Sequence, residues 1–316
     1  MQDTDKAVVD WLMDSDPAIR WQVMRDLTDA PADAVAAERA QVATQGWGAR
    51  LLGLQAVDGQ WDALPWSQDW TDTFHTLELL HIFGLDPQSE AARRAVDRVA
   101  QNVTWKGGAP VDTPWDNNRF FVGEVEPCIN GNVVGIGAYF GQDVDALVER
   151  LLGEQMADGG WNCEQENGAT VGSFGTTIRV LEGLLDYERK ADGPAEVRAA
   201  RLRGQEYMLE RRLFRRKSTG EVIDRDWLKF SFPSWHFYDV LRGLDYLRAA
   251  GAQPDERMAD AAEVVRGKRG ADGRWLLENP HAGKAWFDFG ETEGQPSRWN
   301  TLRAMRVLEW HAATQR

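Results

Sequence analysis

The segment Gln155–Trp161 reads Gln-Met-Ala-Asp-Gly-Gly-Trp, and it recurs with few changes as Gln55–Trp61 and Arg269–Trp275. In each copy an Asp-Gly pair leads to a Trp, and an apolar helical stretch stands before it. The first two copies lie roughly 100 residues apart, about twice the span of one long helical hairpin. Repetition of this kind is typical of repeat architectures. We therefore interpret the chain as a series of helical hairpins.

The repeated phrase has a physical interpretation. Gly tolerates the left-handed conformation in which helices end, and Asp favours the turn. The Trp just beyond is placed to lie over the next hairpin, and the upstream Gln can bond helix-end groups. We therefore expect Trp61, Trp161 and Trp275 to clamp neighbouring repeats and to take no part in chemistry.

Helical periodicity extends through the whole chain, and strand signals are nearly absent. Asp16-Pro17 is a helix start, since Pro is favoured at the first helical position. The six predicted hairpins pair Lys6–Met13 with Pro17–Leu27, Ala32–Leu54 with Thr71–Phe83, Ser89–Gln101 with Cys128–Phe140, Val144–Gln155 with Thr170–Tyr187, Pro194–Arg212 with Ser234–Ala250, and Pro254–Lys268 with Ser297–Ala312.

The two helices of each hairpin differ in character. Second helices are small and apolar, as in Gly131–Gly137, whereas first helices carry charge, as in Glu90–Asp97. A helix without a polar face is buried. We therefore predict an all-α fold, a closed α/α toroid (an α6/α6 barrel) in which the second helices line a central cavity, with residues 1–316 as one domain. An open superhelix of helical pairs is the alternative.

Composition narrows the functional class. Hydrophobic residues make up 43% of the chain and 15 residues are Trp, enough for a sizeable core. A net charge of −14 argues against nucleic acid as a partner, because phosphate binding needs a basic face. There is no signal-peptide pattern and no apolar run long enough for a membrane span. Two Cys cannot form a disulfide framework. We expect a cytoplasmic protein; its protein partners cannot be predicted.

The three Trp phrases resemble the QW repeat of squalene–hopene cyclases and the related repeat of protein prenyltransferase β subunits. Only the first two copies keep the Gln. The resemblance implies a closed toroid and an enzyme that acts on an isoprenoid or other apolar substrate, by transfer or by cyclisation. A carbohydrate-active α/α barrel (a hydrolase or lyase) and a non-catalytic ligand-binding toroid remain as alternatives.

One end of such a ring collects the N-termini of the inner helices, whose unpaired N–H groups favour anions. Long aromatic loops, 104–127, 213–233 and 276–296, lead to the same end. A mouth of this kind suits an apolar chain with an anionic head group, although the aromatic residues could simply plug the barrel. The residues predicted to bind substrate are His75, Trp115, Phe174, Trp235, Tyr238, Trp286, Arg298 and Asn300. The last two could equally cap the final helix.

Both cysteines and one histidine are predicted to lie near this mouth. Soft thiolates with an imidazole are ligands that zinc selects, so Cys128, Cys163 and His236 form a candidate zinc site. Zinc is the only cofactor that the sequence suggests. Free Cys are often inert small hydrophobic residues, and burial without metal is the alternative.

The metal interpretation gains from the same family resemblance. Glu126-x-Cys128 is similar to the carboxylate–Cys segment of prenyltransferase β subunits, and the residues that follow His236 are similar to their His segment. The sequence departs from that family in two respects: Glu stands in place of Asp, and one further inner helix lies between the Cys and His helices.

Three carboxylates are candidate catalytic acids or bases, namely Asp72, Asp239 and Glu126. Type II cyclases use an Asp-x-Asp-Asp run as a strong acid, and only Asp69-Trp-Thr-Asp72 stands at a comparable position. Asp72 could instead cap a helix N-terminus. A glycosidase would pair two carboxylates across an aromatic cleft, and Glu164 joins the three candidates for that chemistry.

Overall fold

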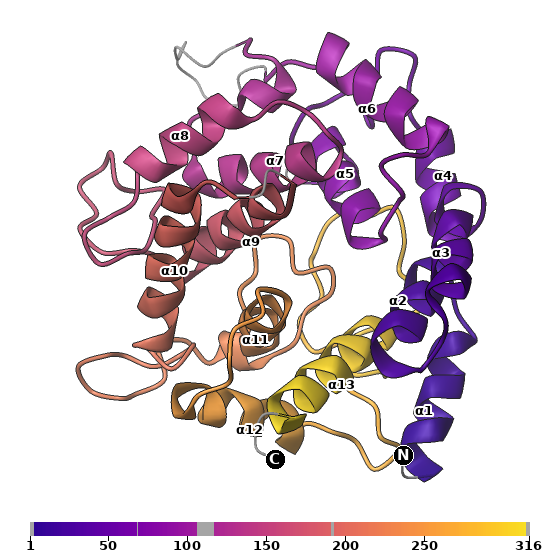
Figure 1. Cartoon of the computed structure of the whole chain (residues 1–316), viewed down its shortest axis with the longest axis vertical. Helices are drawn as coiled ribbons and strands as arrows, with labels where there is room; N and C mark the ends of the chain where they lie inside the picture. Colours follow the sequence, from indigo (N-terminus) through magenta and orange to yellow (C-terminus); the bar gives the residue numbers. More distant parts are fainter. Residues whose placement is uncertain (1–2, 68, 106–116, 191–192, 314–316) are drawn as a thin grey trace. The chain divides into compact units, whose positions relative to one another are not determined.

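The computed structural model describes residues 3–67, 69–105, 117–190 and 193–313. Figure 1 shows this part of the chain as helices joined by turns and loops; it contains isolated β-bridges but no β-strand. The predicted all-α fold class is therefore confirmed.

By its internal contacts the chain divides into two compact units. Unit 1 consists of residues 1–42, 208–282 and 287–316, and unit 2 consists of residues 43–207 and 283–286. Each unit is built of packed helical pairs. The closure of six hairpins into one ring and the single domain over 1–316 remain predictions.

The helices follow one another along the chain with short connections in most places. Their bounds are α1 Asp3–Met13, α2 Pro17–Leu27, α3 Ala32–Ala40, α4 Gly46–Gly53, α5 Thr73–Ile82, α6 Glu90–Asn102, α7 Pro127–Tyr139, α8 Asp145–Gly153, α9 Phe174–Lys190, α10 Ala195–Leu209, α11 Val240–Ala249, α12 Ala259–Gly267 and α13 Arg298–Ala313.

Two predicted helices differ from those observed. The helix expected over Ala32–Leu54 is divided into α3 and α4, because a 3-10 turn follows α3 and Gly46 has a φ of 63°, which interrupts a right-handed helix. The helix expected from Ser234 begins only at Val240. Turns precede it, and Trp235 has a φ of 36°, outside the helical region.

The three Trp phrases share one geometry. Each indole is 0–1% exposed. Its Nε1–H donates to a backbone carbonyl of the preceding helix at 2.7 Å. Its backbone N–H donates to a Thr hydroxyl of the next helix along the chain. The partners are Leu51 and Thr73 for Trp61, Leu151 and Thr177 for Trp161, and Val265 and Thr301 for Trp275.

The upstream Gln extends this link to a further helix. The side-chain amide of Gln155 donates to the carbonyl of Gly159 and to that of Ala200 in α10, both at 2.8 Å. Gln55 makes the equivalent bonds to Gly59 and to Ala95 in α6. Each of these two phrases thus joins three helical segments, as the clamp interpretation predicts.

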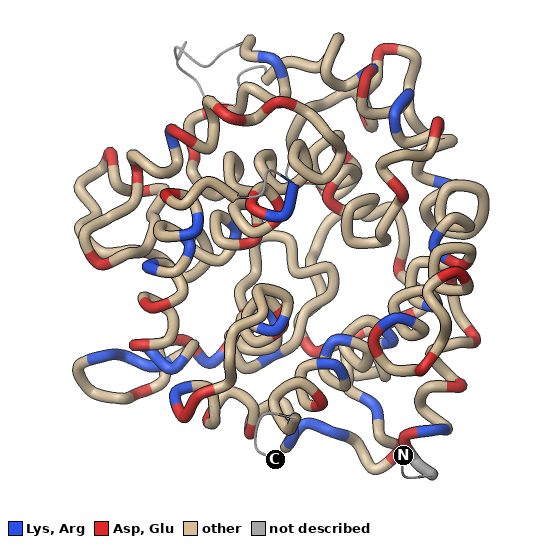
Figure 2. Tube along the Cα trace, viewed as in Figure 1, with Lys and Arg blue, Asp and Glu red and all other residues tan. Residues whose placement is uncertain are grey.

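Helices α7 and α9 of unit 2 pack at very short range because glycines face each other. A Cβ on Gly183 of α9 would collide with the carbonyl oxygen of Gly131, and a Cβ on Gly131 would lie 2.8 Å from Val180. Helix α7 also packs against α5 and α8. Figure 2 shows charged residues along α6 and α8 but none on α7, as expected for a buried helix.

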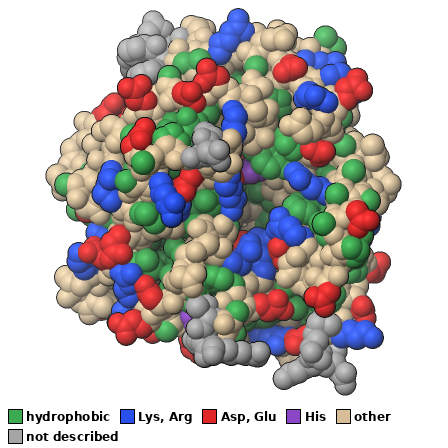
Figure 3. Space-filling model, in the orientation of Figure 1, with side chains coloured by type: hydrophobic (Ala, Val, Ile, Leu, Met, Phe, Trp, Pro, Cys, Tyr) green, Lys and Arg blue, Asp and Glu red, His purple; other side chains and the backbone are tan. Residues whose placement is uncertain are grey.

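The surface is mixed in character. Figure 3 shows acidic and basic side chains interspersed with hydrophobic ones on the visible face. Among the described residues, no helix has the length and apolar character needed to cross a membrane.

Candidate functional site

Two thiols and a carboxylate meet at the start of α7 and α9. Pro127 occupies the first turn of α7, so Glu126 stands at the N-cap position and Cys128 in the first turn. Cys163 follows Trp161, and its backbone N–H and its Sγ both lie 3.4 Å from the hydroxyl of Thr176 in α9. The close packing of α7 on α9 therefore brings the two cysteines together.

The donor atoms of Glu126, Cys128 and Cys163 all lie within 4.8 Å of one another, and the Cys128 Sγ lies 3.4 Å from a Glu126 carboxylate oxygen. Two thiolates on one tetrahedral zinc stand about 3.8 Å apart, given Zn–S bonds of about 2.3 Å. The three residues therefore fit a zinc ion with small side-chain adjustments. Glu126, predicted as a catalytic residue, here lies beside two thiols in a group that could hold a metal ion, and its catalytic role stays a prediction.

A hydrogen bond between the thiols separates their acidities. It raises the pKa of Cys128, with burial acting in the same direction, and it lowers the pKa of Cys163. Cys163 is therefore the sulfur that ionises more readily, and its thiolate accepts a hydrogen bond from the Cys128 thiol. A thiolate is the form that binds metal or attacks an electrophile.

A pocket of about 380 Å³ opens beside this centre. Cys163 and Glu126 line it, together with the turn 162–167 and residues at the end of α8. Its lining includes four carboxylates, those of Glu126, Glu154, Glu164 and Glu166. An acidic pocket attracts cations, and a metal ion is the simplest cation to suit it.

Asp72 and His75 form a second buried pair in unit 2. Asp72 caps α5: its carboxylate accepts from the His75 backbone N–H at 2.9 Å and lies 2.8 Å from the imidazole Nδ1. Ser67 adds a backbone N–H at 2.8 Å and its hydroxyl at 3.2 Å. The interpretation of Asp72 as a helix cap is confirmed, and its role as an acid stays a prediction.

Asp239 plays the same structural part in unit 1, where it caps α11. Its carboxylate accepts from the backbone N–H groups of Arg242 at 2.8 Å and Ser231 at 3.2 Å. Burial raises its pKa despite the nearby charge of Arg303. The two N–H bonds favour the charged form of the carboxyl group, and its role as an acid stays a prediction.

The aromatic candidates occupy defined positions in their own units. Trp286 donates to the hydroxyl of Thr76 at 2.8 Å, and Phe174 packs on Tyr207 with ring centroids 5.6 Å apart. Tyr238 donates to the carbonyl of Leu213 at 2.7 Å, and Trp235 is 2% exposed. Trp115 lies outside the described residues.

His236, the third predicted zinc ligand, belongs to unit 1, whereas Cys128 and Cys163 belong to unit 2. Its exposed imidazole lies beside Phe237 and His281, with ring centroids 4.5 Å and 5.0 Å away. Its participation in a metal site stays a prediction.

Arg298 and Asn300 have partners at the start of α13. The Asn300 amide donates to the carbonyl of Leu276 at 3.0 Å. Arg298 donates to the carbonyl of Asp14 at 3.1 Å, and its guanidinium lies 4.7 Å from the ring centroid of Trp11. These contacts hold helix ends together, and binding of substrate by either residue stays a prediction.

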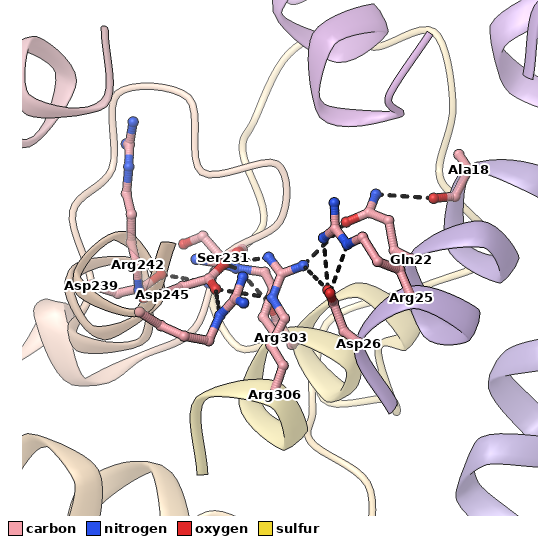
Figure 4. Close-up of polar contacts among 12 residues, drawn as sticks. Ala18, Gln22, Arg25, Asp26, Ser231, Asp239, Arg242, Asp245, Arg303 and Arg306 are labelled. Atoms are coloured by element: carbon pink, nitrogen blue, oxygen red, sulfur yellow. Dashed lines mark hydrogen bonds and ion pairs between the residues drawn. The ribbon is translucent and has the colours of Figure 1, made fainter. Parts of the chain in front are cut away.

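Figure 4 shows a polar network that joins α2, α11 and α13 of unit 1. Arg306 of α13 pairs with Asp245 of α11 at 2.9 Å and with Asp26 of α2 at 3.4 Å. Although burial opposes it, the charge of Arg306 holds the pKa of Asp245 well below its usual range, with help from Arg248. The network therefore serves mainly to lock three helices together.

One buried charge was not singled out from the sequence. Arg179 of α9 is 4% exposed and lies among apolar residues. The sequence does contain a sign of this buried charge, because a single Arg stands in the predicted buried segment Thr170–Tyr187. It was overlooked because Arg in a helix is usually a solvated residue.

Comparison with solved structures finds similar helical proteins. A protein from Actinoplanes is 20% identical with a TM-score of 0.47, over 98% of this chain and 100% of that one. The type II terpene cyclase MstE from Scytonema is 15% identical with a TM-score of 0.47, over 98% of each chain. A variant of MstE in complex with geranylgeranyl dihydroxybenzoate, its substrate, is 16% identical with a TM-score of 0.44, over 94% of this chain and 87% of that one.

No protein-family model matches the chain, and no curated protein matches it either. At these identities none of the structural similarities assigns an activity to this chain.

Proposed function

We propose that this protein is an enzyme that acts on an isoprenoid or similarly apolar substrate with an anionic head group, by transfer or cyclisation. We propose further that a zinc ion on Glu126, Cys128 and Cys163 takes part. The observation that carries the proposal is the meeting of two thiols and a carboxylate within 4.8 Å beside a pocket. The resemblance of the Trp phrases and of Glu126-x-Cys128 to prenyltransferase β subunits supports the class of substrate.

The donor set suits a catalytic role more than a structural one. Structural zinc sites use four protein ligands, whereas catalytic sites use three and leave one position open. When bound, zinc supplies a Lewis acid and keeps thiolates ionised at neutral pH. In this chain the hydrogen bond from Cys128 lowers the pKa of Cys163, which eases the ionisation of that thiol, and the carboxylate of Glu126 can accept the proton of Cys128.

Metal content is the first test. Elemental analysis of the purified protein after zinc reconstitution should give close to one zinc per chain. Cys128→Ala and Cys163→Ala should each remove most of it, whereas Glu164→Gln, which changes the same pocket outside the ligand set, should retain it. Less than a tenth of a zinc per chain in the wild-type protein would overturn the metal part of the proposal.

Substrate class is the second test. Incubation with prenyl diphosphates of 10 to 20 carbons and a thiol acceptor, followed by mass spectrometry, separates the two reaction types. Transfer breaks the C1–O bond, joins the prenyl carbon to the acceptor sulfur and releases pyrophosphate, whereas cyclisation started by protonation yields an isomer of unchanged mass. Ligand binding should also raise the melting temperature by mass action. Absence of turnover together with equal thermal shifts for prenyl diphosphates and neutral prenols would count against this function.

A second candidate function has one observation in its favour. Glu126 and Glu164 line the same pocket, and glycosidases place two carboxylates across one cleft. Under this alternative Glu164→Gln should abolish hydrolysis of a glycan substrate found by screening. A glycan panel that gives neither binding nor hydrolysis would exclude it.

A further inference from the structure

Arg179 of α9 is a buried cation that has no anionic partner among the described residues. Its side chain is 4% exposed. Within the described residues it makes no hydrogen bond and no ion pair; its guanidinium carbon lies 6.0 Å from the centroid of the Phe74 ring. None of its nitrogen atoms is among the fully buried polar atoms that lack a partner, so the guanidinium keeps some contact with solvent. A cation so largely removed from water favours the binding of an anion, which a weak contact with one ring does not replace.

The direction of this side chain follows from the packing of unit 2. Helix α7 packs on α9 at one side and on α5 at the other. The backbone of Arg179 in α9 packs against Gly131 of α7. The guanidinium at the other end of its side chain lies beside the ring of Phe74 on α5. The side chain therefore crosses the face of α7. Gly131 follows Cys128 by three residues on α7, so this path lies along the part of α7 next to the thiol centre.

A second unfilled donor lies on the same helix face. Asn132 is one turn after Cys128 on α7, a spacing that places both on one side of a helix. Asn132 is 8% exposed, and its Nδ2 is buried without a hydrogen-bond partner among the described residues. Buried amide donors are almost always bonded, so a missing acceptor is expected here as well.

We propose that Arg179 and Asn132 bind the anionic head group of the substrate. The guanidinium fork suits two oxygens of a carboxylate or phosphate group, and the Asn132 amide can donate to one of the same oxygens. The head group then lies next to the thiol centre. The proposal rests on the proposed function for the apolar tail of the ligand, but the anion site itself does not depend on it.

Glu78 sets a condition on the ligand. It stands one turn after Phe74 on α5, is 7% exposed, and its Oε2 is buried without a hydrogen-bond partner in the described part of the chain. Glu78 therefore lies on the next turn of the helix that the Arg179 guanidinium approaches, and an unpartnered carboxylate there repels an anion and favours a head group with an O–H donor. Glu78→Gln should therefore tighten the binding of inorganic pyrophosphate.

Four probes test the site by calorimetry: farnesyl diphosphate, farnesoic acid, farnesol and inorganic pyrophosphate. The wild-type protein should bind at least one of the anionic farnesyl compounds about tenfold or more tightly than farnesol. The comparison of diphosphate with carboxylate tells which head group the site prefers. Arg179→Met should reduce the affinity for the anion to that for farnesol, and Asn132→Leu should weaken it less.

The matched control is Arg189→Met, on the same helix. Arg189 is half exposed and pairs with Asp186, so this variant should keep the wild-type preference for anions. Circular dichroism checks the fold of each variant, and Arg179→Gln, which also removes the charge, is used if Arg179→Met does not fold. Equal anion preference in the wild type and in either folded variant would overturn the proposal, as would no preference in the wild type.

The two proposals fail in different ways. If pyrophosphate binds and Arg179→Met abolishes its binding, but no prenyl compound binds, the anion site stands and the isoprenoid function fails. If prenyl compounds are turned over with equal affinity in the wild type and in Arg179→Met, the function stands and the anion site fails.

Discussion

Replacement of Trp161 by Ala should strongly destabilise unit 2. The indole is fully buried, packs against Gly204 of α10, and donates to the carbonyl of Leu151 at 2.7 Å. A buried Trp removes about 150–250 Å² from water. At about 25 cal/mol per Å², that area corresponds to roughly 4–6 kcal/mol. Ala keeps part of this burial, so we expect a loss of about 3–5 kcal/mol in the free energy of unfolding.

Urea unfolding followed by circular dichroism at 222 nm measures this loss. In a thermal scan, the same change should lower the melting temperature by about 6–20 °C for a cooperative unit of this size. Trp161→Phe keeps the ring contacts and loses the N–H donor, so it should cost less, about 1–2 kcal/mol. Trp66→Ala in the same unit is the control: Trp66 is 41% exposed, and its loss should stay within about 0.5 kcal/mol. A loss below about 1 kcal/mol for Trp161→Ala would refute the clamp interpretation.

Burial raises the pKa of Glu124 to about 7, so its neutral form favours folding below pH 4.5 and this contribution is lost as pH rises to 7. Glu124→Gln should therefore stabilise the protein at pH 8 but not at pH 4, as urea titrations at both values will show. Asp245→Asn should lower the free energy of unfolding by about 3–5 kcal/mol, because it leaves Arg306 buried without its main carboxylate partner, and high salt should change this loss little. Gly183→Ala should destabilise by about 1–3 kcal/mol or more through its collision with Gly131, whereas Gly153→Ala, with open space around it, should be nearly neutral in the same assay.

Much of the helical architecture could be predicted from local sequence. The Pro17–Leu27 helix begins and ends where Asp16-Pro17 and its apolar spacing place it. The Trp phrases predicted both burial and the link to a further helix. The failures came from backbone conformations that residue type does not reveal. Gly46 reads as a tolerated helical residue, and Ser234–Tyr238 has helical spacing, yet positive φ values at Gly46 and Trp235 interrupt both segments.

The candidate site was only partly predictable. Helix-start positions correctly suggested that Cys128 and Cys163 lie near each other, because both stand where the chain enters a buried helix. Glu126 lies beside the two cysteines because Pro127 begins α7, which places Glu126 at the N-cap position next to the first turn. That Arg179 and the Asn132 amide have no hydrogen-bond partner in the described part of the chain could not be predicted, since it depends on what every neighbouring helix offers.

The division of the chain into two units has a consequence for biosynthesis. Unit 2 is almost continuous, from residue 43 to 207, whereas unit 1 needs α13 to complete the network that ties it to α2. Chains emerge from the ribosome slowly compared with helix packing. We therefore expect unit 2 to fold while translation continues, and α1 and α2 to wait with exposed apolar faces until the last helix arrives. Nascent chains arrested before residue 298 should accordingly be protected from protease in residues 43–207 and cut readily before residue 42.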